Sequence, residues 1–222
     1  LKDISLKIPV GNWLCVMGAS GCGKTTLLYL LSRLYEPQRG EILIDGIPLG
    51  KIRMSSLRRR VGVVPQEAQI FSGSVRDNIS YGVPDAPPGR VMAAAKAAQL
   101  HDFILTMKVQ YETLLGQRGT SLSGGQRQRL SLARALLTDP EVLILDDCTS
   151  ALDAETERRI QETLAEILVG KTAIIVSQRV SMALRCHRIC TIEDGIIAEY
   201  GTHAELLKAG GFYARLHAQQ TE

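Results

Sequence analysis

The chain has 222 residues, and its 26 Lys and Arg against 23 Asp and Glu give a formal net charge of +3. This weak positive charge excludes a nucleic-acid or membrane-surface binder that works through charge alone. With 45% hydrophobic and 22% charged residues, and no apolar run near the roughly 20 residues of a membrane-spanning helix, the composition is that of a folded globular domain.

The first part of the chain combines strand-like runs with one helical pattern. Turn signals separate the first three strand-like runs, which predicts a small antiparallel β subdomain. These runs cover residues 4–8, 13–17 and 41–45. We also expect a helix over residues 24–34 and a strand over residues 61–64.

The middle of the chain, residues 71–137, has a mainly helical pattern. Pro84, Pro87 and Pro88 interrupt it before an alanine-rich helix expected at residues 90–100. We expect an α-helical subdomain here, inserted into a core made of residues 1–70 and 138–222.

After residue 137, strand-like runs again alternate with helical patterns. Strands are expected at residues 142–145 and 172–176, and helices at residues 154–168 and 180–184. Together with the earlier run at residues 13–17, this alternation predicts an α/β fold with a mostly parallel sheet flanked by helices.

The cysteines are odd in number, which argues against a disulfide framework and favours a reducing compartment. They are Cys15, Cys22, Cys148, Cys186 and Cys190. Cys186 and Cys190 flank His187, but no second Cys or His pair has the spacing of a zinc site, so we interpret them as structural.

Residues 18–25, with the sequence GASGCGKT, match the phosphate-loop pattern G-x-x-x-x-G-K-[ST] between a strand-like run and a helical one. Backbone N–H groups of such a loop face phosphate oxygens, Lys24 neutralises their charge, and the Thr25 hydroxyl ligates Mg²⁺. The motif predicts a P-loop NTPase core. Its nucleotide-binding residues would be Gly18, Ala19, Ser20, Gly21, Cys22, Gly23, Lys24, Thr25 and Thr26.

An acidic pair, Asp146 and Asp147, follows the apolar run of residues 142–145. A phosphate loop needs an acidic residue at the end of a buried strand. We expect Asp146 to hold Mg²⁺, directly or through water, and Asp147 to face the water next to the γ-phosphate.

Residues 122–126, with the sequence LSGGQ, resemble the signature motif of the ATP-binding cassette (ABC) family. Ser123 is a good N-cap, and Gly124 and Gly125 expose backbone N–H groups at a helix N-terminus, which is a second anion-binding device. In this family two cassettes dimerise head to tail. The resemblance implies that Ser123, Gly124, Gly125 and Gln126 act on the nucleotide held by a partner cassette.

The resemblance covers nearly the whole chain. It implies that Gln66 is the Q-loop glutamine and a Mg²⁺ ligand, that Asp153 belongs to the D-loop, and that Gln178 stands where the family has its switch histidine. The cofactors implied are ATP and Mg²⁺, and no nucleic acid is implied.

Residues 69–79 and 113–119 resemble exporters rather than importers. The second segment is similar to the exporter X-loop, which touches the membrane domain, although Gln117 replaces its usual glutamate. The chain opens at Leu1 without an initiator Met, so we expect a piece of a longer polypeptide. The transmembrane domain and the adenine-stacking aromatic would precede Leu1, and the cassette would lie at the cytoplasmic face of a membrane, a bacterial inner membrane.

Two departures from the family pattern weaken the same hydrolytic step. Asp147 stands in place of a glutamate general base, and Gln178 cannot carry the positive charge of a histidine. With the signature intact, this pattern resembles the degenerate half of heterodimeric exporters. The resemblance implies that catalytic roles at this chain's own site would fall to Asp147, Gln178 and Lys24.

Three alternatives stay open. The first is a homodimeric exporter in which Asp147 is an imperfect base. The second is a soluble ABC clamp on DNA or ribosomes, which the exporter-like segments oppose. The third is a regulatory module that binds nucleotide without hydrolysis.

Three further features have plain interpretations. We expect Trp13 to be a core residue, and residues 58–60, with the sequence RRR, to form a solvated cationic face. Cys22 lies near a predicted helix N-terminus and is either a modifiable thiol or an inert one.

Overall fold

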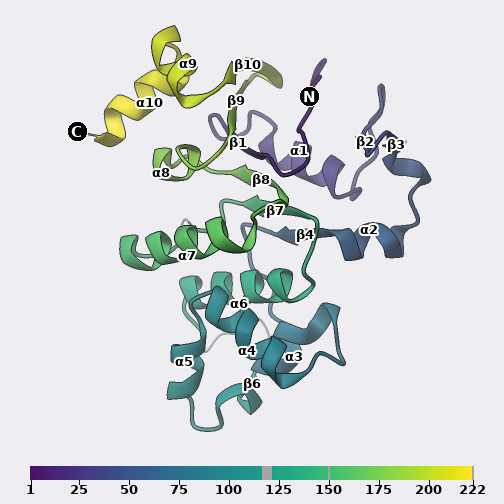
Figure 1. Ribbon diagram of the computed structural model, residues 1–222, viewed down its shortest axis with the longest axis vertical. Coiled ribbons are helices and arrows are strands. Elements are labelled where there is room, and N and C mark those ends of the chain that lie inside the picture. The colour runs from purple at the N-terminus through teal and green to yellow at the C-terminus, as the bar shows by residue number, and fades with distance from the viewer. Residues whose placement is uncertain (117–121, 150, 222) are drawn as a thin grey trace.

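The structure is a computed structural model that describes residues 1–116, 122–149 and 151–221 (Figure 1). The strands are β1 (Trp13–Met17), β2 (Leu43–Ile44), β3 (Ile47–Pro48), β4 (Val61–Val64), β5 (Gly73–Ser74), β6 (Leu114–Leu115), β7 (Val142–Asp146), β8 (Thr172–Val176), β9 (Arg188–Glu193) and β10 (Ile196–Gly201). The α-helices are α1 (Lys24–Leu31), α2 (Met54–Arg60), α3 (Val75–Ile79), α4 (Pro88–Ala97), α5 (His101–Thr106), α6 (Gly124–Leu137), α7 (Ala154–Ile167), α8 (Val180–Ala183), α9 (His203–Ala209) and α10 (Phe212–Thr221). Short 3₁₀ helices are η1 (Leu49–Lys51), η2 (Ser80–Gly82) and η3 (Gln110–Glu112).

A six-stranded sheet with the order β10-β9-β1-β8-β7-β4 forms the centre of the fold. All neighbours in it are parallel except the β9–β10 hairpin. Two small antiparallel sheets pair β2 with β3 and β5 with β6. The predicted α/β fold with a mostly parallel sheet is therefore confirmed.

The parallel strands at the centre of the sheet, β1, β7 and β8, are buried on both faces, as expected for such strands. Along β1, Leu14 and Val16 share a core cluster with Leu27 and Leu28 of α1. Trp13 points to the opposite face and shares a cluster with helices α4, α6 and α7. Trp13 is 6% exposed, so its interpretation as a core residue is confirmed.

The expected antiparallel subdomain is smaller than the sequence pattern indicates. Within the described residues 1–12 no strand forms, so the expectation for residues 4–8 is wrong. The alternation of Ile4, Leu6 and Ile8 has a different cause: these side chains are partly buried against the cluster of Leu14 and Val16. The run at residues 13–17 lies in the parallel sheet as β1, and only Leu43–Ile44 of residues 41–45 is a strand.

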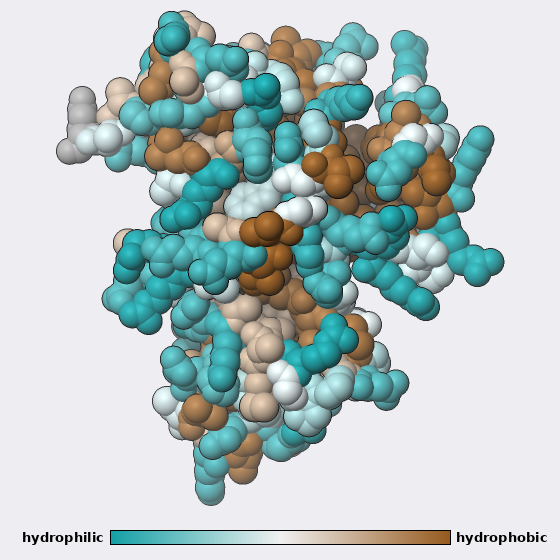
Figure 2. Space-filling view, viewed as in Figure 1, coloured by the Kyte–Doolittle hydropathy of each residue, from teal (hydrophilic) through white to brown (hydrophobic). Residues whose placement is uncertain are grey.

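The helices α3, α4, α5 and α6 gather at one end of the molecule, far from α9 and α10 at the other (Figure 1). Helix α6 packs on α3, α4 and β4, and so connects these helices to the sheet. The face shown in Figure 2 is mostly hydrophilic, with hydrophobic residues limited to small patches and a strip near its centre. None of the helices in the described ranges is long and apolar enough to cross a membrane.

Candidate functional site

The carboxyl ends of four neighbouring parallel strands, β1, β8, β7 and β4, lie at one edge of the sheet. Loops that follow parallel strands meet at that edge, which is where α/β folds place their ligands. A cavity of about 220 Å³ lies there. Its lining residues are Ser20, Gly21, Gly23, Lys24, Thr25, Thr26, Gln66, Asp146, Asp147, Val176, Ser177 and Gln178.

The loop between β1 and α1 depends on glycine at two positions. Gly18 has φ 142°, and a Cβ on it would lie 2.3 Å from the carbonyl oxygen of Ile192. Gly23 has φ 110° and is the N-cap of α1, so the helix begins at Lys24. The backbone can wrap tightly and present a helix N-terminus to the cavity only because these residues lack a side chain.

The ammonium group of Lys24 is hydrogen-bonded to the loop itself. Lys24 Nζ donates to the carbonyl oxygens of Gly18 and Ala19, both at 2.7 Å, and lies 3.7 Å from Cys22 Sγ. The lysine therefore closes the loop on itself and places a positive charge at the cavity. Gly18, Ala19 and the buried Cys22 belong to the loop but are not among the described residues that line the cavity.

The acidic pair ends β7 at the same cavity. Asp146 is 7% exposed, and its pKa is raised by burial and by the charge of Asp147, while Lys24 acts in the opposite direction. Asp147 has φ 42°, a left-handed conformation that aspartate tolerates better than most residues. Its backbone N–H donates to the carbonyl oxygen of Val176 at 2.9 Å, which joins the ends of β7 and β8.

The ends of β4 and β8 contribute amide side chains. Gln66 follows β4 and Gln178 follows β8, and both line the cavity. Ser177 also lines it and was missed by sequence reasoning: its Oγ accepts a hydrogen bond from the backbone N–H of Arg179 at 3.1 Å. Its position directly after the predicted strand at residues 172–176 was the available signal.

The signature residues lie at the start of α6. Ser123 caps this helix in a capping box, because its Oγ accepts from Gln126 N–H at 3.2 Å while Gln126 Oε1 accepts from Ser123 N–H at 2.8 Å. A Cβ on Gly125 would lie 3.0 Å from the Leu152 side chain, so α6 closely approaches the D-loop. None of residues 123–126 lines the cavity in the described part of the chain.

Asp153 has a structural task at the start of α7. Its carboxylate accepts from the backbone N–H of Thr156 at 2.9 Å, and this N-cap hydrogen bond lowers the pKa of Asp153. The predicted site residues thus form two sets: one lines the cavity, and the other lies at the N-termini of α6 and α7. Residues 117–119 of the predicted X-loop and residue 150 of the D-loop lie outside the described residues.

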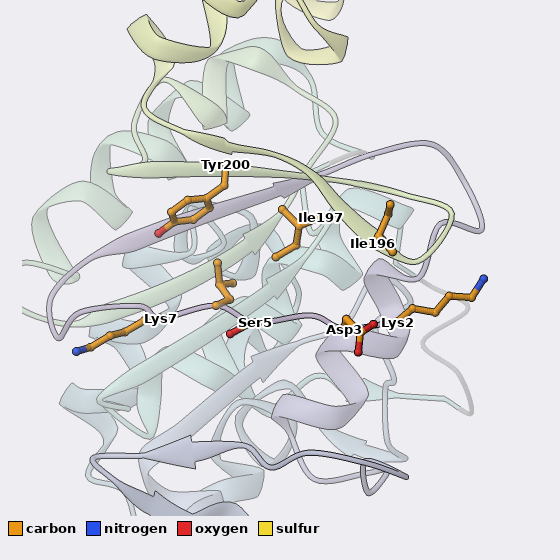
Figure 3. A pocket seen from close by; sticks show the side chains of 8 residues that line it. Lys2, Asp3, Ser5, Lys7, Ile196, Ile197 and Tyr200 are labelled. Atoms are coloured by element: carbon orange, nitrogen blue, oxygen red, sulfur yellow. The ribbon is translucent and has the colours of Figure 1, made fainter.

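A second cavity of about 540 Å³ lies between the N-terminal segment and β10. Figure 3 shows Tyr200 and Ile197 of β10 facing Ser5 and Lys7 of that segment. Within the described chain, no predicted site residue lines this cavity. It is the larger of the two, but its lining comes from the N-terminal segment and β10 and includes no helix N-terminus among the described residues, so the first is the candidate site.

A parallel sheet with a phosphate loop after one strand and an aspartate at the end of a nearby strand defines a P-loop NTPase. The sequence model of one family, described as "ABC transporter", matches residues 1–150. The chain therefore belongs to the ABC transporter family, and the resemblance drawn from residues 122–126 is confirmed.

Two similar proteins are a flippase and a secretion protein, and a similar solved structure is an ABC exporter. Over 221 residues the chain is 45% identical to the ATP-dependent lipid A-core flippase of Alkalilimnicola ehrlichii, covering 99% of this chain and 38% of that protein. It is 49% identical to the cyclolysin secretion/processing ATP-binding protein CyaB of Bordetella pertussis, covering 99% of this chain and 31% of that protein. A solved structure of a bacterial Atm1-family ABC exporter with ATP bound is similar with TM-score 0.92 and 39% identity, covering 96% of this chain and 37% of that one. The chain thus spans about a third of the length of these proteins.

Proposed function

We propose that the chain is the ATP-binding and ATP-hydrolysing domain of an exporter, which powers transport through ATP-driven dimerisation of two cassettes. Residues 1–70 and 138–222 would form the nucleotide-binding core, and residues 71–137 the helical subdomain. The transmembrane domain would precede Leu1 in the same transporter, and the cassette would lie at the cytoplasmic face of a membrane, a bacterial inner membrane. The similarity to a lipid flippase, a secretion protein and a solved ABC exporter, each about three times as long as this chain, supports this proposal.

The cavity fits a nucleotide phosphate with Mg²⁺. Thr25, Gln66 and Asp146 line it with hydroxyl, amide and carboxylate oxygens, which are the donors that Mg²⁺ takes. These three residues would hold the ion, which when bound neutralises phosphate charge. Burial and the neighbouring Asp147 carboxylate raise the pKa of Asp146, and a bound cation would favour the ionised form of this carboxylate.

The residues of the loop would bind the phosphates. Backbone N–H groups at the α1 N-terminus and the Lys24 ammonium would contact the phosphate oxygens. Lys24 already lies at hydrogen-bond distance from two carbonyl oxygens, and it would exchange these neutral acceptors for charged ones.

One observation supports a slow site: the residues proposed to bind phosphate and metal, Lys24, Thr25, Gln66 and Asp146, line the same cavity as Asp147 and Gln178. These last two are the residues that depart from the family pattern at the positions proposed for hydrolysis. The Asp147 carboxylate would orient the attacking water from one methylene further back than a glutamate. Gln178 could donate a hydrogen bond to the γ-phosphate without positive charge. The chain's own site would therefore bind ATP and hydrolyse it slowly.

The signature would act on a partner cassette, which we propose to be non-identical to this chain. Ser123, Gly124, Gly125 and Gln126 lie outside the cavity and expose the N-terminus of α6. In a head-to-tail dimer this intact anion-binding device would complete the partner's site, with Asp153 in the D-loop next to it.

Exposed aromatic residues near the β5–β6 sheet offer a surface for the transmembrane domain. Phe71 and Tyr81 stack with ring centroids 4.3 Å apart and are 39% and 60% exposed, and Leu114 is 78% exposed. Apolar groups on an otherwise polar surface are typical of an interaction site.

The test is single-turnover ATP hydrolysis at saturating Mg²⁺-ATP, with nucleotide affinity measured in parallel. The wild-type chain is compared with the Asp147→Glu/Gln178→His variant. Moving the carboxylate by about one methylene toward the water is expected to raise the rate on the order of 100-fold, at unchanged affinity. As a control, Arg58→Lys on the exposed face of α2 should change neither quantity.

The results distinguish a slow site from a self-sufficient homodimer. Fast wild-type turnover with little gain on substitution would refute the slow site and leave a self-sufficient homodimer. A wild-type chain that does not bind Mg²⁺-ATP would refute the proposed function itself.

A further inference from the structure

We propose that Gln220, on the C-terminal helix α10, is a positioning residue that holds the segment carrying Gln178 against the nucleotide cavity. The inference rests on the proposed function, because it concerns the hydrolytic step. It assigns a role in that step to a residue that sequence reasoning did not single out.

The carboxamide of Gln220 brackets the backbone around Gln178 with two hydrogen bonds. Gln220 Nε2 donates to the carbonyl oxygen of Gln178 at 2.8 Å, and Gln220 Oε1 accepts from the backbone N–H of Val180 at 2.9 Å. One bond needs a donor and the other an acceptor, so the amide has a single orientation that satisfies both. The Gln220 side chain thus pairs with one backbone C=O and one backbone N–H of this segment, as the backbone of a neighbouring strand would.

The segment needs this external support because its own capping is incomplete. Helix α8 has only four residues, and its N-cap residue, Arg179, makes no side-chain cap hydrogen bond. The first N–H groups of a helix have no partner within the helix. For Val180 the missing acceptor is supplied by Gln220, from an element 40 residues away in the sequence.

Other contacts fix the segment on either side of Gln178. The backbone N–H of Ser177 donates to the carbonyl oxygen of Val16 at 3.3 Å, next to the phosphate loop. The Arg179 guanidinium donates to the buried carboxylate of Glu157 on α7. The Gln178 side chain is itself exposed and lines the cavity, so its direction depends on how firmly its backbone is held.

Helix α10 is anchored well enough to serve as the support. Tyr213 in its first turn is fully buried, and its backbone N–H donates to Glu199 Oε2 of β10 at 3.0 Å. The Tyr213 hydroxyl lies 2.8 Å from Nδ1 of His203 on α9. Gln220 lies two turns further along the same helix, which packs against α8.

A positioning role makes a prediction that separates it from a structural one. Nucleotide affinity would come from the loop at residues 18–26 and the metal-binding side chains, which Gln220 does not touch. Loss of the bracket would let Gln178 move relative to the γ-phosphate, and a displacement near 1 Å is enough to slow a reaction strongly. The single-turnover rate should therefore fall while the affinity for Mg²⁺-ATP stays the same.

The experiment compares Gln220→Ala and Gln220→Glu with the wild-type chain and with Gln219→Ala, a matched control that removes an exposed glutamine from the same helix turn. The Glu variant keeps an acceptor for Val180 N–H but presents no donor to the Gln178 carbonyl at pH 8. Both Gln220 variants should lower the rate about tenfold with less than a twofold change in the dissociation constant for Mg²⁺-ATP. Gln219→Ala should match the wild type.

Amide hydrogen exchange of residues 177–183 gives a readout that does not depend on hydrolysis. Exchange at Val180 should accelerate in Gln220→Ala and stay slow in Gln219→Ala. Unchanged exchange, or a wild-type rate in both Gln220 variants, would overturn the inference, and so would a parallel loss of rate and affinity. A wild-type chain that does not bind Mg²⁺-ATP would instead refute the proposed function. The hydrogen-exchange measurement could still detect the two Gln220 hydrogen bonds in that case, but their proposed role in hydrolysis would be refuted.

Discussion

Arg134 offers a sharp test of what holds the helical end of the molecule to residues 69–81. Its guanidinium projects from α6 and donates to three oxygens: Asn78 O at 2.8 Å, Gln69 O at 2.9 Å and Asn78 Oδ1 at 3.1 Å. The same group lies 4.9 Å from the ring centroid of Phe71 and 5.9 Å from that of Tyr81. Burial lowers the pKa of Arg134, so the charge is held in place by these contacts at some desolvation cost.

The substitution Arg134→Lys keeps the charge and removes the planar fork. A lysine ammonium can satisfy one of these oxygens, so about two charged hydrogen bonds and the stacking on the rings are lost. At about 1.5 kcal/mol for each, the low end for a hydrogen bond to a charged group, the free energy of unfolding should fall by about 3 kcal/mol. For a chain of this length, such a loss lowers the melting temperature by roughly 6 to 12 °C.

Urea unfolding followed by circular dichroism would measure this loss. Arg58→Lys on the exposed face of α2 is the control, because it makes the same chemical change on a solvated side chain and should stay within about 0.5 kcal/mol of the wild type. If Arg134→Lys were as stable as this control, the fork would not be what joins α6 to residues 69–81.

Two further predictions concern a glycine and a helix cap. Gly18→Ala should lower the free energy of unfolding by about 2 to 4 kcal/mol and abolish nucleotide binding. The reason is that Gly18 has φ 142° and the new Cβ would lie 2.3 Å from a backbone oxygen. Urea unfolding measures the loss, with Gly89→Ala in α4, whose Cβ would meet open space, as the control. Asp153 has a lowered pKa, so its cap stabilises the fold above the unfolded-state pKa of about 3.9 and that stability is lost as pH falls through the lower folded-state pKa. The Asp153→Asn variant keeps a capping side chain that does not titrate. Between pH 5 and pH 2 the urea midpoint of this variant should therefore fall less than that of the wild type. Equal falls in the two midpoints would contradict the role of the Asp153 carboxylate as the cap.

The position of the site could be predicted from the sequence because parallel strands bring their carboxyl ends together. The loop at residues 18–25 fixed one strand end, and Gln66, Asp146 and Gln178 each follow another predicted strand. These residues can be expected at one edge of a sheet without knowledge of the tertiary contacts.

The remaining features depend on contacts that local patterns do not encode. The alternation of Ile4, Leu6 and Ile8 predicts a strand, but it reflects packing on the core, and residues 1–12 as described form no strand. The bracket formed by Gln220 joins residues 42 positions apart, and nothing in the run GFYARLHAQQ indicates it. Lys24 binding the carbonyl oxygens of its own loop is likewise a property of the folded loop.

The capping box of α6 determines how the Ser123 hydroxyl can be used. Its oxygen accepts the Gln126 N–H, which holds the side chain in one rotamer and leaves the hydroxyl proton available for another acceptor. In the proposed dimer this hydroxyl would meet an incoming phosphate as a donor whose oxygen is already in place before the two cassettes touch. The entropic cost of ordering the Ser123 side chain is therefore met when α6 folds, and dimer closure would only have to bring the phosphate to it.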